Sequence, residues 1–233
     1  MKIKRFVSVF LLCACITALF LTPAASAQEA PELHSKAALL IDANTGAVVY
    51  AKNEHDELYP ASLTKIMTAL LTLDAIKAGK LSMDQELTAT ATALEGLSAD
   101  GSSAGIKVGE TMTVRNLMYC MLVVSANEAC DILGEAVAGS VSAFVDVMNA
   151  KAQELGCENT HFANPNGLHD PQHYTSAWDM YLITKAALEY PDFLTICDTG
   201  TYTVPATNLS PARTLHTTNF LIDTWRSRGY RNK

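Results

Sequence analysis

The sequence lacks an excess of basic residues and carries little charge of either sign. Its 233 residues include 17 Lys and Arg against 24 Asp and Glu, a formal net charge of −7, and charged residues make up 18%. A protein that binds nucleic acid through charge normally shows a basic face, so this balance argues against a nucleic-acid partner. Internal repeats and low-complexity tracts are also missing, which excludes repeat arrays, while 49% hydrophobic residues suffice for a sizeable core.

Metal and cofactor motifs are missing as well. The sequence contains no H-E-x-x-H pattern and no glycine-rich phosphate loop. His169 and His173 are four residues apart beside Asp170, but they follow the turn sequence Asn164-Pro165-Asn166-Gly167, so the helical geometry of a ligand pair is not expected. We therefore predict neither a metal nor a cofactor.

Long apolar runs are missing except near the N-terminus. Three basic residues among the first five precede an apolar run over residues 6–21, and Ala25-Ser26-Ala27 follows it. A basic segment, a short apolar segment and a small-x-small site are typical of a secretory signal peptide. We expect a signal peptide over residues 1–27 and an extracytoplasmic location, with a retained anchor as the alternative; a lipoprotein site at Cys13 fits poorly.

Cleavage after residue 27 would leave residues 28–233 as one mature domain. The removed segment carries three basic and no acidic residues, so the mature chain has 14 basic against 24 acidic residues, a net charge of −10. Four cysteines remain. They could pair outside the cytoplasm, but we expect buried free thiols because a chain of this length does not depend on disulfides. These cysteines are Cys120, Cys130, Cys157 and Cys197.

The hydrophobic pattern predicts a mixed α/β architecture. Two short apolar runs around Asn44 and Gly46 indicate a β-hairpin over residues 37–50. From Pro60 the apolar spacing becomes helical, and it continues to Gly79. Further helices are expected over residues 114–124, 127–137, 142–155 and 177–189, an extended excursion over 81–110, a loop over 161–176 and a short strand over 201–204.

A candidate nucleophile opens the first long helix. Ser62 and Lys65 are three positions apart, which places the hydroxyl and the amine on the same helix face. A serine is a weak nucleophile until a base takes its proton, and a lysine serves as that base where burial depresses its pKa. S-x-x-K is a weak signal by itself, because a helix-capping serine followed by a surface lysine gives the same pattern.

Ser125-Ala126-Asn127 forms a second polar motif. Side chains two residues apart do not share a helix face, so Ser125 and Asn127 converge on one site only where the helix is interrupted. Ser125 and Glu128 also fit a capping box that opens the next helix. Both interpretations are compatible, because a capped helix start would fix Ser125 and Asn127 at the edge of a cleft.

Together and in this order, the two motifs resemble the penicillin-recognising serine enzymes. The surrounding segments narrow the resemblance to the D-alanyl-D-alanine carboxypeptidases of the low-molecular-mass penicillin-binding proteins, serine peptidase family S11. The resemblance covers nearly the whole expected mature chain. Its segments are Leu40–Gly46, Tyr59–Thr68, Val108–Glu110, Ser125–Ala129, Phe162–Leu168 and His173–Met180.

This resemblance implies a serine acyl-transfer enzyme that removes the terminal D-alanine from peptidoglycan stem peptides and is acylated by β-lactams. It assigns Ser62 as the nucleophile, Lys65 as the general base, Ser125 as a proton relay and Asn127 as an amide that binds substrate or orients Lys65. Ser62, Ser125 and Asn127 would also contact the substrate. The implied fold is β-lactamase/transpeptidase-like, of the α/β (α+β) class, with an antiparallel sheet packed with helices beside a mainly helical subdomain.

One motif of the resemblance is absent. Lys-Thr-Gly, which would supply the second oxyanion donor and a cation for the substrate carboxylate, should follow residues 213–219 and does not occur in the 233 residues. We therefore expect an N-terminal fragment that lacks its C-terminal strands and has activity well below that of a complete relative. The resemblance also allows membrane association of the parent protein through a missing C-terminal segment. A β-lactamase and a non-catalytic wall-binding protein stay open as alternatives.

Overall fold

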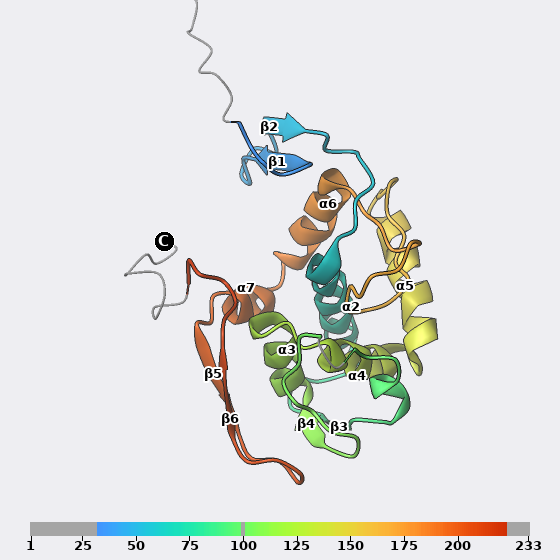
Figure 1. Cartoon of the computed structure of the whole chain (residues 1–233), viewed down its shortest axis with the longest axis vertical. Coiled ribbons are helices and arrows are strands. Elements are labelled where there is room, and N and C mark those ends of the chain that lie inside the picture. The colour runs from blue at the N-terminus through green and yellow to red at the C-terminus, as the bar shows by residue number, and fades with distance from the viewer. Residues whose placement is uncertain (1–31, 99–100, 223–233) are drawn as a thin grey trace, which may run out of the picture. The chain divides into compact units, whose positions relative to one another are not determined.

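The computed structural model describes residues 32–98 and 101–222 (Figure 1). The chain divides into two units, Met1–His34 and Ser35–Lys233, and the second is described here by itself. The expected signal peptide over residues 1–27 lies outside the described residues. Within the described ranges, none of the helices combines the length and the apolar character that crossing a bilayer requires.

An antiparallel hairpin opens the second unit, as the sequence predicts. Strands β1 (Ala38–Ile41) and β2 (Val48–Lys52) pair with an irregularity between Leu40 and Ile41. The Asp42 carboxylate accepts hydrogen bonds from two backbone N–H groups of the connecting turn, at 2.9 Å each. Gly46 closes the turn with a φ of 72°, a backbone conformation that glycine adopts without steric cost.

The remaining elements are mainly helical, and the expected class of mixed helix and strand is confirmed. The helices predicted around residues 114–124, 127–137, 142–155 and 177–189 and the strand at 201–204 are present. The pattern did not predict the helix over residues 191–197 or the strands over 86–88, 111–113 and 213–216. Within residues 32–98 and 101–222 the strands form three two-stranded antiparallel sheets, which pair 38–41 with 48–52, 86–88 with 111–113 and 201–204 with 213–216. In chain order the elements are η1 (Ala61–Thr64), α2 (Lys65–Lys77), β3 (Glu86–Thr88), η2 (Thr92–Leu94), β4 (Thr111–Thr113), α3 (Val114–Val123), α4 (Asn127–Ala138), α5 (Val141–Glu154), α6 (Ala177–Ala187), α7 (Pro191–Cys197), β5 (Thr201–Val204) and β6 (Arg213–His216).

Helix α2 occupies the centre of the core. It contacts α3, α4, α5 and α6, and Figure 1 shows it surrounded by them. Nine of its 13 residues are buried, so its sequence is apolar or small on almost every side rather than along one stripe. Fully burying one of its leucines stabilises the fold by roughly 1.5–3 kcal/mol. Because the helix is held on all sides, its first residue, Lys65, has a fixed position.

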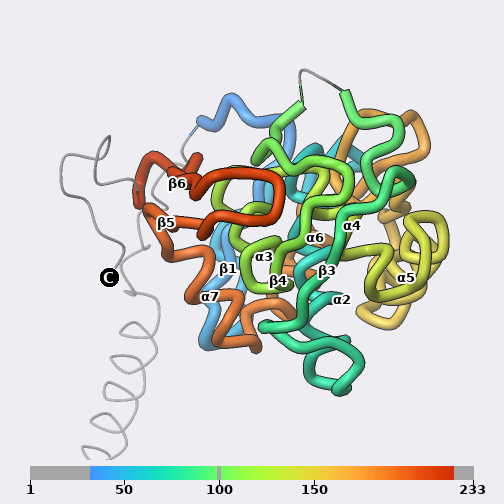
Figure 2. The backbone as a smooth tube through the Cα atoms, turned by 90° about the horizontal axis from the view of Figure 1, so that it is seen from below, coloured from blue at the N-terminus to red at the C-terminus, as the bar shows by residue number. Residues whose placement is uncertain are grey.

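A buried ion pair connects the β5–β6 hairpin to the polar segment over residues 104–110. The hairpin lies beside α3 (Figure 2). Arg213 donates hydrogen bonds to the Glu110 carboxylate and, at 2.8 Å, to the carbonyl of Ala104. Burial by itself would raise the pKa of Glu110, but hydrogen bonds from Thr207 and from the Lys107 N–H, together with the Arg213 guanidinium, hold this pKa below its ordinary value. The pair therefore fixes the polar excursion that leads to the candidate site.

Candidate active site

Ser62 and Lys65 lie at the junction of η1 and α2. Ser62 belongs to the 3-10 turn and Lys65 begins the α-helix, so the predicted α-helical start at Pro60 is wrong for the first turn. Side chains at i and i+3 eclipse in a 3-10 turn, and Lys65 Nζ lies 3.3 Å from Ser62 Oγ. The preceding residue, Ala61, has a φ of 48°. This left-handed conformation costs a non-glycine residue roughly 1–2 kcal/mol, and such strain gathers at functional sites.

Lys65 Nζ is enclosed by three oxygen atoms. Besides Ser62 Oγ, it lies 2.8 Å from Asn127 Oδ1 and 2.6 Å from the carbonyl oxygen of Asn166. The side chain is 3% exposed, and this burial lowers the pKa of Lys65, against the opposing influence of acidic groups that include Asp131. In the neutral amine, two N–H bonds can point to Asn127 and Asn166 while the lone pair faces Ser62. This is the arrangement that a general base requires.

Ser125 reaches Ser62 from an interruption between two helices. It lies between α3 and α4 with a φ of 61°, and its Oγ donates to Ser62 Oγ at 3.0 Å. The helix break that the sequence required for convergence is therefore present. The capping-box interpretation is wrong, because Ala126 is the N-cap of α4 without a side-chain cap. Glu128, the expected partner in that box, accepts instead from Ser103 Oγ and from the Ala104 N–H, at 2.7 Å each.

Asn127 is the first residue of α4 and is almost completely buried. Its side-chain oxygen accepts from Lys65, and its backbone N–H donates to the carbonyl of Ser102 at 2.9 Å. Glu128 holds the same polar segment through its contacts with Ser103 and Ala104. The structure thus brings all four predicted site residues together. Lys65 contacts Ser62 and Asn127, and Ser125 contacts Ser62.

The turn over residues 164–168 supplies site atoms that sequence reasoning did not assign. The Asn164 side chain folds the turn, accepting from the Gly167 N–H at 2.7 Å and donating to the carbonyl of Leu168 at 2.9 Å. Thr68 of α2 donates to the carbonyl of Pro165 at 2.6 Å, which ties the turn to the helix that carries Lys65. As a result the Asn166 carbonyl faces Lys65 Nζ.

His169 and His173 have separate partners. His173 is buried, its Nδ1 accepts from the Ala163 N–H at 3.0 Å, and its Nε2 therefore carries the proton and donates to Thr64 Oγ1 at 2.7 Å. His169 packs edge-on against Tyr59. Across residues 32–98 and 101–222, no three His, Cys, Asp or Glu side chains converge as metal ligands would.

The four cysteines beyond residue 27 are free, as expected. Cys120 and Cys130 are buried, while Cys157 and Cys197 are half-buried. Burial raises the pKa of Cys120 to about 12, so its thiol stays protonated and unreactive at neutral pH.

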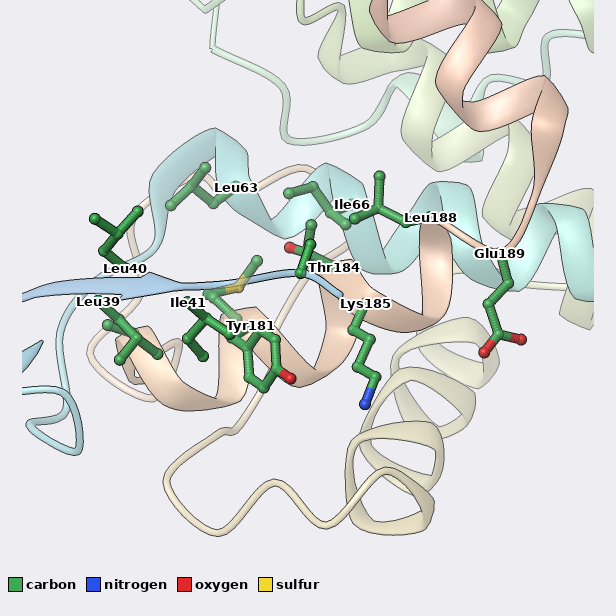
Figure 3. A pocket seen from close by; sticks show the side chains of 13 residues that line it. Leu39, Leu40, Ile41, Leu63, Ile66, Tyr181, Thr184, Lys185, Leu188 and Glu189 are labelled. Atoms are coloured by element: carbon green, nitrogen blue, oxygen red, sulfur yellow. The ribbon is translucent and has the colours of Figure 1, made fainter. Parts of the chain in front are cut away.

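A largely apolar pocket of about 690 Å³ lies between β1, α6 and the start of α2 (Figure 3). Leu63 and Ile66 line it from η1 and α2, opposite Leu39 of β1 and Tyr181 of α6. None of Ser62, Lys65, Ser125 and Asn127 contributes to its wall. The pocket is therefore separate from the four clustered side chains.

The family model for D-alanyl-D-alanine carboxypeptidase, peptidase S11, matches residues 24–224. The chain belongs to this family. This match confirms the family that the sequence suggested. The four clustered side chains come from the two motifs on which that resemblance rests.

Individual S11 relatives and solved structures agree with this assignment. D-alanyl-D-alanine carboxypeptidase DacF of Bacillus subtilis is 41% identical over 168 residues, covering 72% of this chain and 42% of the relative. The carboxypeptidase DacD of Francisella tularensis has a TM-score of 0.72 at 37% identity, over 78% of this chain and 44% of that one. Penicillin-binding protein 6B of Escherichia coli has a TM-score of 0.77 at 30% identity, over 85% and 62%. The fold is thus that of the penicillin-binding proteins, and the chain spans about two fifths of DacF.

The buried His173 makes the stability of this S11 chain depend on pH. Burial lowers the pKa of His173 from 6.5 to about 4, so the unfolded chain takes up a proton at a higher pH than the folded chain does. This histidine's contribution to the free energy of unfolding is complete above pH 6.5 and is lost as the pH falls towards 4. Wild type should therefore exceed His173→Gln in stability most strongly near neutral pH, and the difference should shrink on acidification. Urea unfolding of both proteins at several pH values measures it, and a difference independent of pH would contradict the assignment.

Proposed function

We propose that the protein is a serine-type D-Ala-D-Ala carboxypeptidase that works through an acyl-enzyme on Ser62. The observation that carries this proposal is the buried Lys65 amine, which contacts Ser62 Oγ, Asn127 Oδ1 and the Asn166 carbonyl. A base held beside a serine hydroxyl is what nucleophilic catalysis requires. The family supplies the substrate class, peptidoglycan stem peptides that end in D-Ala-D-Ala, and β-lactams as covalent inhibitors.

Acylation would begin at the hydroxyl of Ser62. Its oxygen attacks the carbonyl carbon of the penultimate D-alanine while its proton passes to Lys65 Nζ, giving a tetrahedral oxyanion. The backbone N–H of Ser62 would donate to this oxyanion, and losing one such donor costs about 3 kcal/mol of barrier in other enzymes. As the C–N bond breaks, the proton on Lys65 returns through Ser125 Oγ to the nitrogen of the leaving D-alanine.

In deacylation, water would be the nucleophile and Ser62 the leaving group. Lys65, neutral again, takes a proton from water, and the hydroxide attacks the ester carbonyl of the acyl-enzyme. Ser62 Oγ recovers a proton as the ester bond breaks, which releases a stem peptide shortened by one D-alanine. Asn127 would hold Lys65 through its side-chain oxygen in both steps, a role that its 2.8 Å contact with Nζ supports.

We also propose that the protein acts outside the cytoplasm. The basic and apolar segments within residues 1–27 and the small-x-small site at their end support export through a signal peptide. The proposed substrate is a component of the bacterial cell wall, so the enzyme would meet it only after export.

A penicillin adduct on Ser62 tests the proposed function. We expect the purified protein to gain the mass of one penicillin, and peptide mapping to locate this mass on Ser62. Ser62→Ala should form no adduct, whereas Ser82→Ala, an exposed serine in the loop after α2, should behave like wild type. Rapid release of hydrolysed penicillin would favour a β-lactamase instead, and wild type without an adduct would favour a non-catalytic protein.

A further inference from the structure

A buried carboxylate lies behind Lys65 and has no part in the mechanism above. Asp131 follows Asn127 by one helical turn on α4, so the two side chains project from the same face. Asp131 is 4% exposed, and its two oxygens lie 3.2 and 3.1 Å from Nδ2 of Asn166. A carboxylate removed from water in this way is costly unless it is hydrogen-bonded, so its position calls for an explanation.

Asn166 connects this carboxylate to the catalytic amine. Its side-chain nitrogen donates to Asp131, and its own backbone carbonyl accepts from Lys65 Nζ at 2.6 Å. Its side-chain oxygen accepts from the Leu168 N–H at 2.9 Å, so every polar atom of the side chain is used. Without Asp131, a buried Nδ2 would lose its acceptor, and the residue that presents its carbonyl to Lys65 would be free to turn.

Three charged groups act on Asp131. Lys65 faces it from α2. Glu128 and Glu135 lie on its own helix, three residues before it and four residues after it. Burial raises the pKa of Asp131 to about 7, while the hydrogen bond from Asn166 and the charge of Lys65 oppose this rise. Above that pH the ionised carboxylate favours the protonated form of Lys65, in opposition to the burial of the amine.

We propose that Asp131 is a positioning residue for Lys65. Through the Asn166 side chain it fixes the carbonyl that holds Lys65 Nζ beside Ser62, and through its negative charge it sets the pH at which that amine becomes a base. This inference rests on the proposed function, because the base role of Lys65 gives the positioning its meaning.

Two substitutions separate the hydrogen bond from the charge. Asp131→Asn keeps an oxygen that accepts from Asn166 but removes the charge, so the titration of Lys65 and the acid limb of the acylation profile should move down by about one pH unit. Asp131→Ala removes the acceptor as well, and a displaced Lys65 should lower the rate of penicillin acylation about 100-fold. Asp146→Asn is the matched control, the same change at an exposed aspartate of α5 that does not act on Asp131 or Lys65, and both readouts should stay near wild type.

The two readouts are independent of each other. NMR of the protein labelled with 13C-lysine follows Lys65 directly, with the resonance assigned by Lys65→Met, and adduct formation against time gives the acylation rate. If wild type forms no adduct, the proposed function fails, and the Lys65 titration still decides the role of Asp131. An unchanged Lys65 titration in Asp131→Asn overturns the proposal, even if Asp131→Ala does not fold. A normal acylation rate in a folded Asp131→Ala overturns it equally.

Discussion

Replacing Lys65 with methionine should lower the rate at which penicillin acylates Ser62 by a factor of about 10²–10⁴, the usual contribution of a general base. Methionine fills a similar volume but has no nitrogen to take the Ser62 proton. It also leaves Asn127 Oδ1 and the Asn166 carbonyl without the donor that they share in wild type. The second-order rate constant, from the growth of adduct mass with time, measures the effect.

Lys65→Arg distinguishes a base from a fixed positive charge. A guanidinium stays protonated at any pH at which the protein is folded, so arginine supplies charge without basicity. We expect Lys65→Arg to be as slow as Lys65→Met, while Lys80→Met, a change of an exposed lysine after the same helix, should acylate normally. An arginine variant that retains most of the wild-type rate would show that Lys65 acts through its charge, against the proposed mechanism.

The parts of this site that lie close together in the chain were predictable from the sequence. Ser62 and Lys65 are three residues apart, and that spacing brings them together in an α-helix and in the 3-10 turn that is present. The helix break at Ser125 followed from the requirement that Ser125 and Asn127 converge. The helices α5 and α6 carry clear apolar periodicity, because each packs one face on the core.

The contacts that span long stretches of chain were not predictable in this way. The Asn166 carbonyl lies 101 residues from Lys65, and a backbone carbonyl leaves no mark in a residue pattern. The carboxylate of Asp131 shows an i, i+4 spacing with Asn127, but the same spacing on an exposed helix face would mean nothing. Only the burial of α4 against α2 gives that carboxylate a role. The capping-box prediction was wrong for a similar reason. Glu128 accepts hydrogen bonds from three donors in the segment over residues 103–106 rather than from the start of its own helix.

Gly167→Ala should both destabilise the protein and slow acylation. An alanine Cβ at this position would lie 1.9 Å from the carbonyl oxygen of Ala61 and 2.4 Å from its carbon, and both are backbone atoms that cannot rotate away. Its φ of 88° is also strained for any residue with a side chain. We expect the free energy of unfolding to fall by roughly 2–4 kcal/mol, the sum of overpacking and backbone strain. Because Ala61 precedes Ser62, a shift of about 1 Å there should lower the acylation rate about 100-fold.

Gly139→Ala is the matched control, since it separates the strain from the clash. Gly139 has a φ of 87°, almost the same as Gly167, but a Cβ there would meet nothing within 4 Å. It should therefore lose only the cost of the left-handed backbone, roughly 1–2 kcal/mol, and acylate at the wild-type rate. Chemical unfolding and penicillin acylation of the two variants give both comparisons. Equal losses of stability would mean that the turn yields to the new methyl group, and normal acylation in Gly167→Ala would mean that the Ser62 turn does not depend on its contact with residues 164–168. A larger loss in Gly167→Ala than in Gly139→Ala would instead show that the active site requires glycine at position 167. Only a residue without a side chain lets the turn that contacts Lys65 approach the turn that carries Ser62.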